Sequence, residues 1–169
     1  MVDNKQEVLD GLREAMQTEV DGYEFYTLAA DRTEDEMGAE AFRILASEEQ
    51  KHLMFLREQY RAIDAEGHAS TSLDICGQHE FEGDMIFSKK ILDNIGDAQF
   101  EMSALSIGIK LELSSIDYYK AQAEKVDDPD LKAFYNDLVN WETHHYDILN
   151  RQHEILKEEF WAKGGFAPF

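Results

Sequence analysis

Two short segments of the chain carry the same pair of metal-binding residue types at the same spacing. Glu49 precedes His52 by three residues, and Glu142 precedes His145 by three. On a helix, residues three apart lie one turn apart on the same face, so each segment offers a carboxylate oxygen and an imidazole nitrogen side by side. His144 adjoins His145, but adjacent helical positions point about 100° apart. We therefore expect His144 at the surface or in a helix contact.

The two segments belong to a longer internal repeat with an offset of 93 residues. At this offset the polar members of the helical stripes coincide as well as the apolar ones. The matched pairs include Leu12 with Leu105, Glu19 with Glu112, Tyr26 with Tyr119, Phe42 with Tyr135, Glu49 with Glu142, His52 with His145, and Leu56 with Leu149. The repeat predicts two copies of one helical hairpin, related by a pseudo-twofold axis.

The four repeated glutamates are expected at one level of such a bundle. Glu19 and Glu49 are equidistant from a polar turn near residue 34, and Glu112 and Glu142 are equidistant from a turn near residue 127. Residues equidistant from the turn of an antiparallel hairpin lie side by side. Each glutamate is about 15 residues, or roughly 22 Å, from its turn. All four carboxylates can therefore meet deep inside the bundle.

Four carboxylates in an apolar interior require compensation. Burying each bare charge costs several kcal/mol unless it is paired or protonated. The stripes place no lysine or arginine near this level, whereas two divalent cations supply the four positive charges. One glutamate from each of two helices, with a Glu-x-x-His from each of the other two, is the ligand set of di-iron and di-manganese bundles. The alternative of surface glutamates and chance histidines fits poorly, because the stripes are otherwise apolar.

One neighbouring acid is expected to lie outside the cluster. Glu48 points about 100° away from the stripe that carries Glu49. Its repeat partner is Trp141, which argues against a role common to both halves. We therefore expect Glu48 at the surface, and support of a metal ligand from behind is the alternative.

The elements that position these residues are four long helices. Apolar periodicity predicts them at about 8–30, 39–63, 97–125 and 130–162, with short polar links at 31–38 and 126–130, where Pro129 acts as a stop. A long crossover at 64–96 joins the hairpins and ends in a short helical candidate. We predict an all-α four-helix bundle in a single domain over residues 1–169, with a C-terminal tail at 163–169.

Composition narrows the range of partners. The formal net charge is −20, which disfavours nucleic acid and anionic membranes. No signal peptide and no apolar run of 18 residues is visible, so we expect a cytoplasmic protein. Cys76 is the only cysteine, which excludes an intramolecular disulfide and a Cys-x-x-Cys metal site.

These residues resemble the ferritin-like superfamily, and most closely its rubrerythrin-type members. The resemblance covers four helices, the long crossover and all six ligand positions. It implies that Glu19 and His52 complete one metal site, that Glu112 and His145 complete the other, and that Glu49 and Glu142 bridge the two. These six residues are also the candidate catalytic residues. Tyr26 and Tyr119 match tyrosines that hydrogen-bond to ligand carboxylates in this group.

The chain departs from the rubrerythrin pattern in two respects. Rubrerythrins usually carry a rubredoxin domain with four cysteines, which this sequence does not contain. They also have an additional glutamate one turn beyond the third-helix ligand, at the position of Ser115 here. The site therefore resembles the symmetric six-ligand site of bacterioferritin and single-domain rubrerythrin-like proteins.

The expected chemistry follows from the ligands. Carboxylates and imidazoles suit iron and manganese, and can also take zinc. With the resemblance, two divalent ions are expected, iron first and manganese or zinc as alternatives. Two ferrous ions can deliver two electrons together, which fits reduction of hydrogen peroxide or O2 in oxidative-stress defence. An external electron-donor protein is then implied, and we expect a homodimer. Two alternatives stay open at this point, namely iron oxidation and storage as in ferritins, and a bundle with a structural di-metal site.

Overall fold

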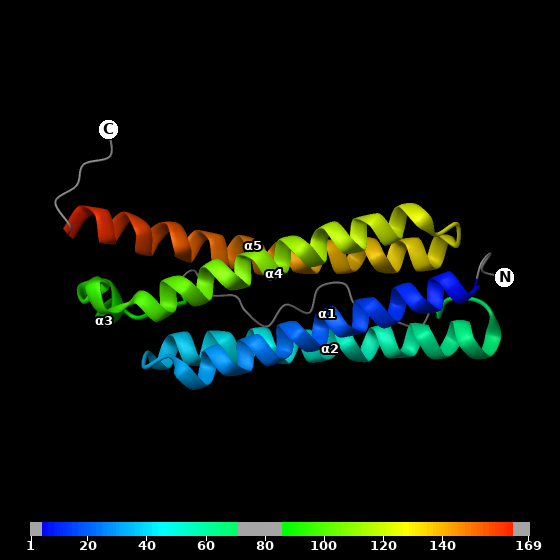
Figure 1. The fold of residues 1–169 in the computed structure, drawn as a ribbon, viewed down its shortest axis with the longest axis horizontal. Coiled ribbons are helices and arrows are strands. Elements are labelled where there is room, and N and C mark those ends of the chain that lie inside the picture. The colour runs from blue at the N-terminus through cyan, green and yellow to red at the C-terminus, as the bar shows by residue number, and fades with distance from the viewer. Residues whose placement is uncertain (1–4, 71–85, 164–169) are drawn as a thin grey trace.

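The computed structural model describes residues 5–70 and 86–163, with Asp97 described by its backbone alone. This part of the chain is helical and contains no strand. Its elements are α1 (Lys5–Arg32), α2 (Glu36–Glu66), the short α3 (Lys89–Asp93), a 3-10 turn η1 (Ile95–Asp97), α4 (Gln99–Lys125) and α5 (Pro129–Lys163). Figure 1 shows the four long helices lying side by side, with α1 next to α2 and α4 next to α5. The predicted all-α bundle of two hairpins is confirmed.

Repeat-related aspartates cap the second helix of each hairpin. Asp35 precedes α2 and accepts a hydrogen bond from the backbone N–H of Gly38 at 3.0 Å. Asp128 precedes α5 and accepts from the N–H of Leu131 at 3.0 Å. Such caps satisfy helix donors that have no intrahelical acceptor. Pro129 was predicted as a stop, but it is the first residue of α5, where its missing N–H costs nothing.

The crossover is attached to the bundle at both described ends by repeat-related glutamines. The side chain of Gln59 on α2 both donates to and accepts from the backbone of Ser70, at 2.9 Å each. On α5, Oε1 of Gln152 accepts from the N–H groups of Ile86 at 2.9 Å and Phe87 at 3.2 Å. The short helix expected in this region is α3. The middle of the crossover, with Cys76, lies outside the described residues, as does the tail after Lys163.

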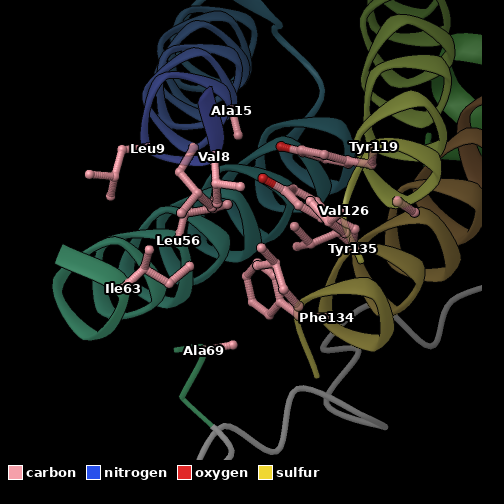
Figure 2. Packing of buried hydrophobic residues seen from close by; sticks show 14 of the residues in the cluster. Val8, Leu9, Ala15, Leu56, Ile63, Ala69, Tyr119, Val126, Phe134 and Tyr135 are labelled. Atoms are coloured by element: carbon pink, nitrogen blue, oxygen red, sulfur yellow. The ribbon is translucent and has the colours of Figure 1, made fainter. Parts of the chain in front are cut away.

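The hydrophobic core falls into two clusters, one towards each end of the bundle. The first surrounds Leu12, Leu56 and Leu138, and the second surrounds Phe42 and Leu105. Figure 2 shows part of the first cluster, in which Tyr119 from α4 and Tyr135 from α5 lie against each other with a ring separation of 6.2 Å. The glutamate level lies between the two clusters, so apolar packing closes it off from both ends of the bundle.

None of the described helices is long and apolar enough to cross a membrane.

Candidate metal centre

The structure brings all six predicted ligands together in the middle of the bundle. Each of these residues is at most 4% exposed. Within each of two groups, one oxygen or nitrogen atom per residue lies within 4.8 Å of all the others. The first group is Glu19, Glu49, His52 and Glu142, and the second is Glu49, Glu112, Glu142 and His145. The level predicted from the two turns is therefore the level at which these side chains meet.

Glu49 and Glu142 occur in both groups, because each carboxylate divides its oxygens between the two histidines. In Glu49, Oε2 lies 3.6 Å from Nδ1 of His52, and Oε1 lies 3.2 Å from Nδ1 of His145. In Glu142, Oε1 lies 3.0 Å from Nδ1 of His52, and Oε2 lies 3.3 Å from Nδ1 of His145. This is the arrangement required of two bridging carboxylates.

Glu19 and Glu112 each serve one half of the cluster. Oε2 of Glu19 lies 3.1 Å from Nδ1 of His52, and Oε1 of Glu112 lies 3.7 Å from Nδ1 of His145. Tyrosines from the opposite hairpin hold their carboxylates, since Tyr119 donates to Glu19 and Tyr26 donates to Glu112. Both tyrosines are fully buried. These hydrogen bonds fix the orientation of the two terminal carboxylates and join α1 to α4.

Burial and mutual repulsion govern the protonation of the terminal carboxylates. Burial raises the pKa of Glu19 well above its ordinary value, and the charges of Glu142 and Glu49 raise it further. The same causes, in the same order, raise the pKa of Glu112. Both groups therefore retain protons more readily than exposed glutamates when no cation is bound.

The surrounding carboxylates raise the pKa values of the two histidines. Burial by itself lowers the pKa of His52, but the negative charges of Glu142 and Glu19 outweigh it and raise the pKa well above its ordinary value. Burial also opposes protonation of His145, but the nearby carboxylates of Glu112 and Glu142 outweigh it and raise the pKa of His145 well above its ordinary value. In the metal-free protein, protons therefore offset part of the negative charge, and a cation that binds here displaces them.

In the part of the chain that the structure describes, several buried oxygen and nitrogen atoms of the cluster lack a hydrogen-bond partner, which suits a metal site better than a hydrogen-bonded network. Among the described residues, Oε1 of Glu49, both oxygens of Glu142 and Nδ1 of His145 are buried without a hydrogen-bond partner. They lie close together, but not in hydrogen-bonding geometry. Buried polar groups are rarely left in this state. Oxygen and nitrogen lone pairs converging on one point suit a divalent cation such as iron, manganese or zinc.

The prediction that Glu48 lies at the surface is wrong. Its side chain is completely buried, and Oε2 lies 2.6 Å from Nε2 of His145, on the side of the ring that faces away from the cluster. A bundle helix buries a wider arc than one stripe because it packs against two neighbours. The sequence signal was available in the repeat itself, since Trp141 occupies the matching position on α5 and is also buried.

A small cavity reaches the cluster from the side, between α1 and α4. Its volume is about 200 Å³, and its walls include the carboxylates of Glu49 and Glu112. Gly22 and Ser115, which are repeat partners, line the same cavity. A Cβ atom at Gly22 would lie 3.3 Å from the Glu49 carboxylate, so glycine keeps this wall open. Ser115 occupies the position where rubrerythrins are expected to carry an additional glutamate, and its hydroxyl donates to the carbonyl of Leu111 on its own helix.

Comparison with known families agrees with this geometry. A sequence model of the rubrerythrin family matches residues 10–153, which include the whole cluster. The chain belongs to the rubrerythrin family. Comparisons with curated proteins and with solved structures gave no match. Family membership together with the buried carboxylate and histidine cluster supports a divalent metal site in this rubrerythrin-family protein.

Proposed function

We propose that this rubrerythrin-family protein is a di-iron oxidoreductase that reduces hydrogen peroxide. The observation that carries the proposal is the division of the Glu49 and Glu142 oxygens between His52 and His145, which prepares two metal positions that share two ligands. Two ferrous ions bound in this way supply two electrons, which together with two protons convert one hydrogen peroxide molecule into two water molecules. The protein binds, orients and encloses the reacting centre.

The surroundings of the cluster support a small oxidant as substrate. Pockets for drug-sized ligands typically enclose about 300–1,000 Å³, and the cavity beside Glu49 measures about 200 Å³. Its rim includes exposed Asp21 and Ser114, whereas Glu49 and Glu112 at its inner end are buried. This shape suits hydrogen peroxide or O2. The apolar clusters on either side exclude water and limit side reactions.

Return to the reduced state requires electrons from outside the chain. We propose an external electron-donor protein for this step, and a homodimer as the working form. A role in oxidative-stress defence follows from the substrate.

Anaerobic titration tests the proposal. The protein is loaded with two Fe(II) ions per chain and titrated with hydrogen peroxide while near-ultraviolet absorbance is followed. We expect an endpoint at one peroxide molecule per two Fe(II) ions, reached faster than with free Fe(II). Glu142→Ala should lose the response, whereas Glu101→Gln, which alters a buried glutamate bonded to Thr33 away from the cluster, should keep it.

The same titration separates the alternatives. Iron that is held but not oxidised by peroxide would indicate a structural site and refute the proposal. Iron uptake that continues far beyond two ions per chain in the presence of oxidant would indicate storage instead.

A further inference from the structure

The outer edges of the two cluster histidines meet different partners at positions that the repeat makes equivalent. Glu48 precedes Glu49 and Trp141 precedes Glu142, at the common offset of 93 residues. Both side chains are buried, and each contacts the histidine of the opposite hairpin. Glu48 lies 2.6 Å from Nε2 of His145, while the Trp141 ring lies 4.4 Å from the His52 ring, centroid to centroid. One histidine therefore meets a carboxylate where the other meets an indole.

The contact with Glu48 prepares His145 as a ligand. The Nε2–H group of His145 donates to the Glu48 carboxylate, which leaves Nδ1 facing Glu49 and Glu142 as the nitrogen that a cation can bind once it displaces the proton. A carboxylate behind a ligand histidine fixes its tautomer and ring orientation and makes its nitrogen a stronger donor. Glu48 also adds a further acid close to this half of the cluster.

His52 has no equivalent support among the described residues. Its Nε2 atom is buried and has no hydrogen-bond partner there. The Trp141 ring packs against it at an interplanar angle of 76°, which restrains the imidazole by contact. An indole carries no formal charge and accepts no conventional hydrogen bond, so it does not strengthen the donor nitrogen as a carboxylate does.

We propose that the two metal positions are inequivalent, and that the position formed by Glu112, His145 and the shared Glu49 and Glu142 binds a divalent cation first. Glu48 is the positioning residue that creates the difference, acting through His145. Loss of such an outer carboxylate typically lowers metal affinity about 10–100-fold. This inference rests on the metal site of the proposed function and assigns an order to its loading.

The test uses two variants, each of which keeps one of the two metal positions. His52→Ala leaves the Glu48-supported position intact, and His145→Ala leaves the Trp141-contacted position intact. Each is titrated with Co(II), followed by calorimetry and by visible absorbance of the bound ion. We expect His52→Ala to bind one Co(II) about 10–100-fold more tightly than His145→Ala does.

Glu48→Gln shows whether Glu48 is responsible. Added to His52→Ala, it should lower the Co(II) affinity to that of His145→Ala, and added to His145→Ala it should have no effect. Glu101→Gln serves as the control for removal of a buried glutamate, and it should leave both affinities unchanged. Circular dichroism of each protein checks that it is folded. In the otherwise unaltered chain, Glu48→Gln should merge two resolved Co(II) binding steps into one, which tests the inference without either histidine variant.

Equal affinities in the two histidine variants, or tighter binding by His145→Ala, would overturn the inference. An equal loss at both positions on Glu48→Gln would overturn it as well, since that result indicates general support of the fold. None of these measurements involves peroxide. Unequal binding by a protein that does not respond to peroxide would therefore refute the proposed reaction alone, whereas no Co(II) binding at all would refute both.

Discussion

Removing one bridging carboxylate should abolish most of the stabilisation that metal gives to the fold. Glu142 presents one oxygen to each histidine, so Glu142→Ala removes a ligand from both positions. Glu19 belongs to one group only, so Glu19→Ala leaves Glu49, Glu112, Glu142 and His145 as a complete second group. The structure therefore predicts that Glu142→Ala loses the metal-dependent stabilisation in full. Glu19→Ala should lose no more than half of it, because the position inferred to bind first stays complete.

The size of the metal-dependent stabilisation follows from the linkage between metal binding and folding. A site that binds only the folded state stabilises it by about 2.7 kcal/mol when the free metal concentration is 100 times Kd. At 100 times the Kd of the weaker position, the two positions together contribute at least about 5 kcal/mol. For a domain of this size, 1 kcal/mol corresponds to roughly 2–4 °C in Tm, so metal should raise the Tm of the unaltered protein by about 10–20 °C. Glu19→Ala should keep at least half of this shift, because it retains the position inferred to bind more tightly, and Glu142→Ala should keep almost none.

Differential scanning calorimetry of each protein with and without Mn(II) measures these shifts. Comparing each variant with its own metal-free form cancels the effect of the substitution on the metal-free fold. Glu101→Gln should show the full metal-dependent shift, because Glu101 hydrogen-bonds to Thr33 and is not part of either group. If Glu142→Ala kept the full shift at a metal concentration that saturates the unaltered protein, the bridging assignment would be refuted.

Three further predictions concern the cavity, the crossover and a helix cap. Ser115→Leu should block the cavity and slow peroxide oxidation of bound iron at least ~10-fold, about 1.4 kcal/mol of added barrier, without loss of iron, whereas exposed Ser103→Leu on the same helix should do neither. Gln152→Leu should lower the free energy of unfolding in urea by about 2–5 kcal/mol, because two buried crossover amides lose their acceptor. Although burial opposes it, hydrogen bonds from Ser88 and Gly38 hold the pKa of Asp35 below its ordinary value. The stability advantage over Asp35→Asn should therefore be complete above about pH 5 and should decline as the pH falls below ~4, as measured by urea unfolding at several pH values.

The six candidate ligands could be found from the sequence because each breaks an apolar stripe at a position that the repeat duplicates. A buried acid such as Glu19 stands out on a stripe with Leu12, and its copy at Glu112 makes coincidence improbable. Their common level followed from helix rise and the two turns alone. The helix ends were less well determined. Helix α1 begins at Lys5 instead of residue 8. Residues 5–7 are polar and show no apolar periodicity, so the pattern gives no sign that the helix includes them.

Glu48 was missed for a different reason. Its type and position are those of a solvent-facing acid when α2 is considered alone. Its burial depends on how α2 and α5 approach each other, which local periodicity does not encode. The attachment of the crossover by Gln59 and Gln152 was also absent from the prediction, because an exposed glutamine and one that holds a backbone segment have the same helical signature.

The two hairpins carry the same residue types at the six candidate ligand positions. They differ at the pair of positions that contacts the outer edges of the two histidines. Bridging requires four carboxylates and two histidines in register, and the repeat matches all six, together with Tyr26 and Tyr119 that hold the terminal carboxylates. One pair of repeat-related residues that contacts these ligands from outside differs between the halves. Glu48 and Trp141 contact the outer edges of the histidines. A duplicated hairpin that diverged only in surface residues would leave these inner contacts identical. Their difference, at buried positions against the ligands, is the physical reason to expect unequal metal positions.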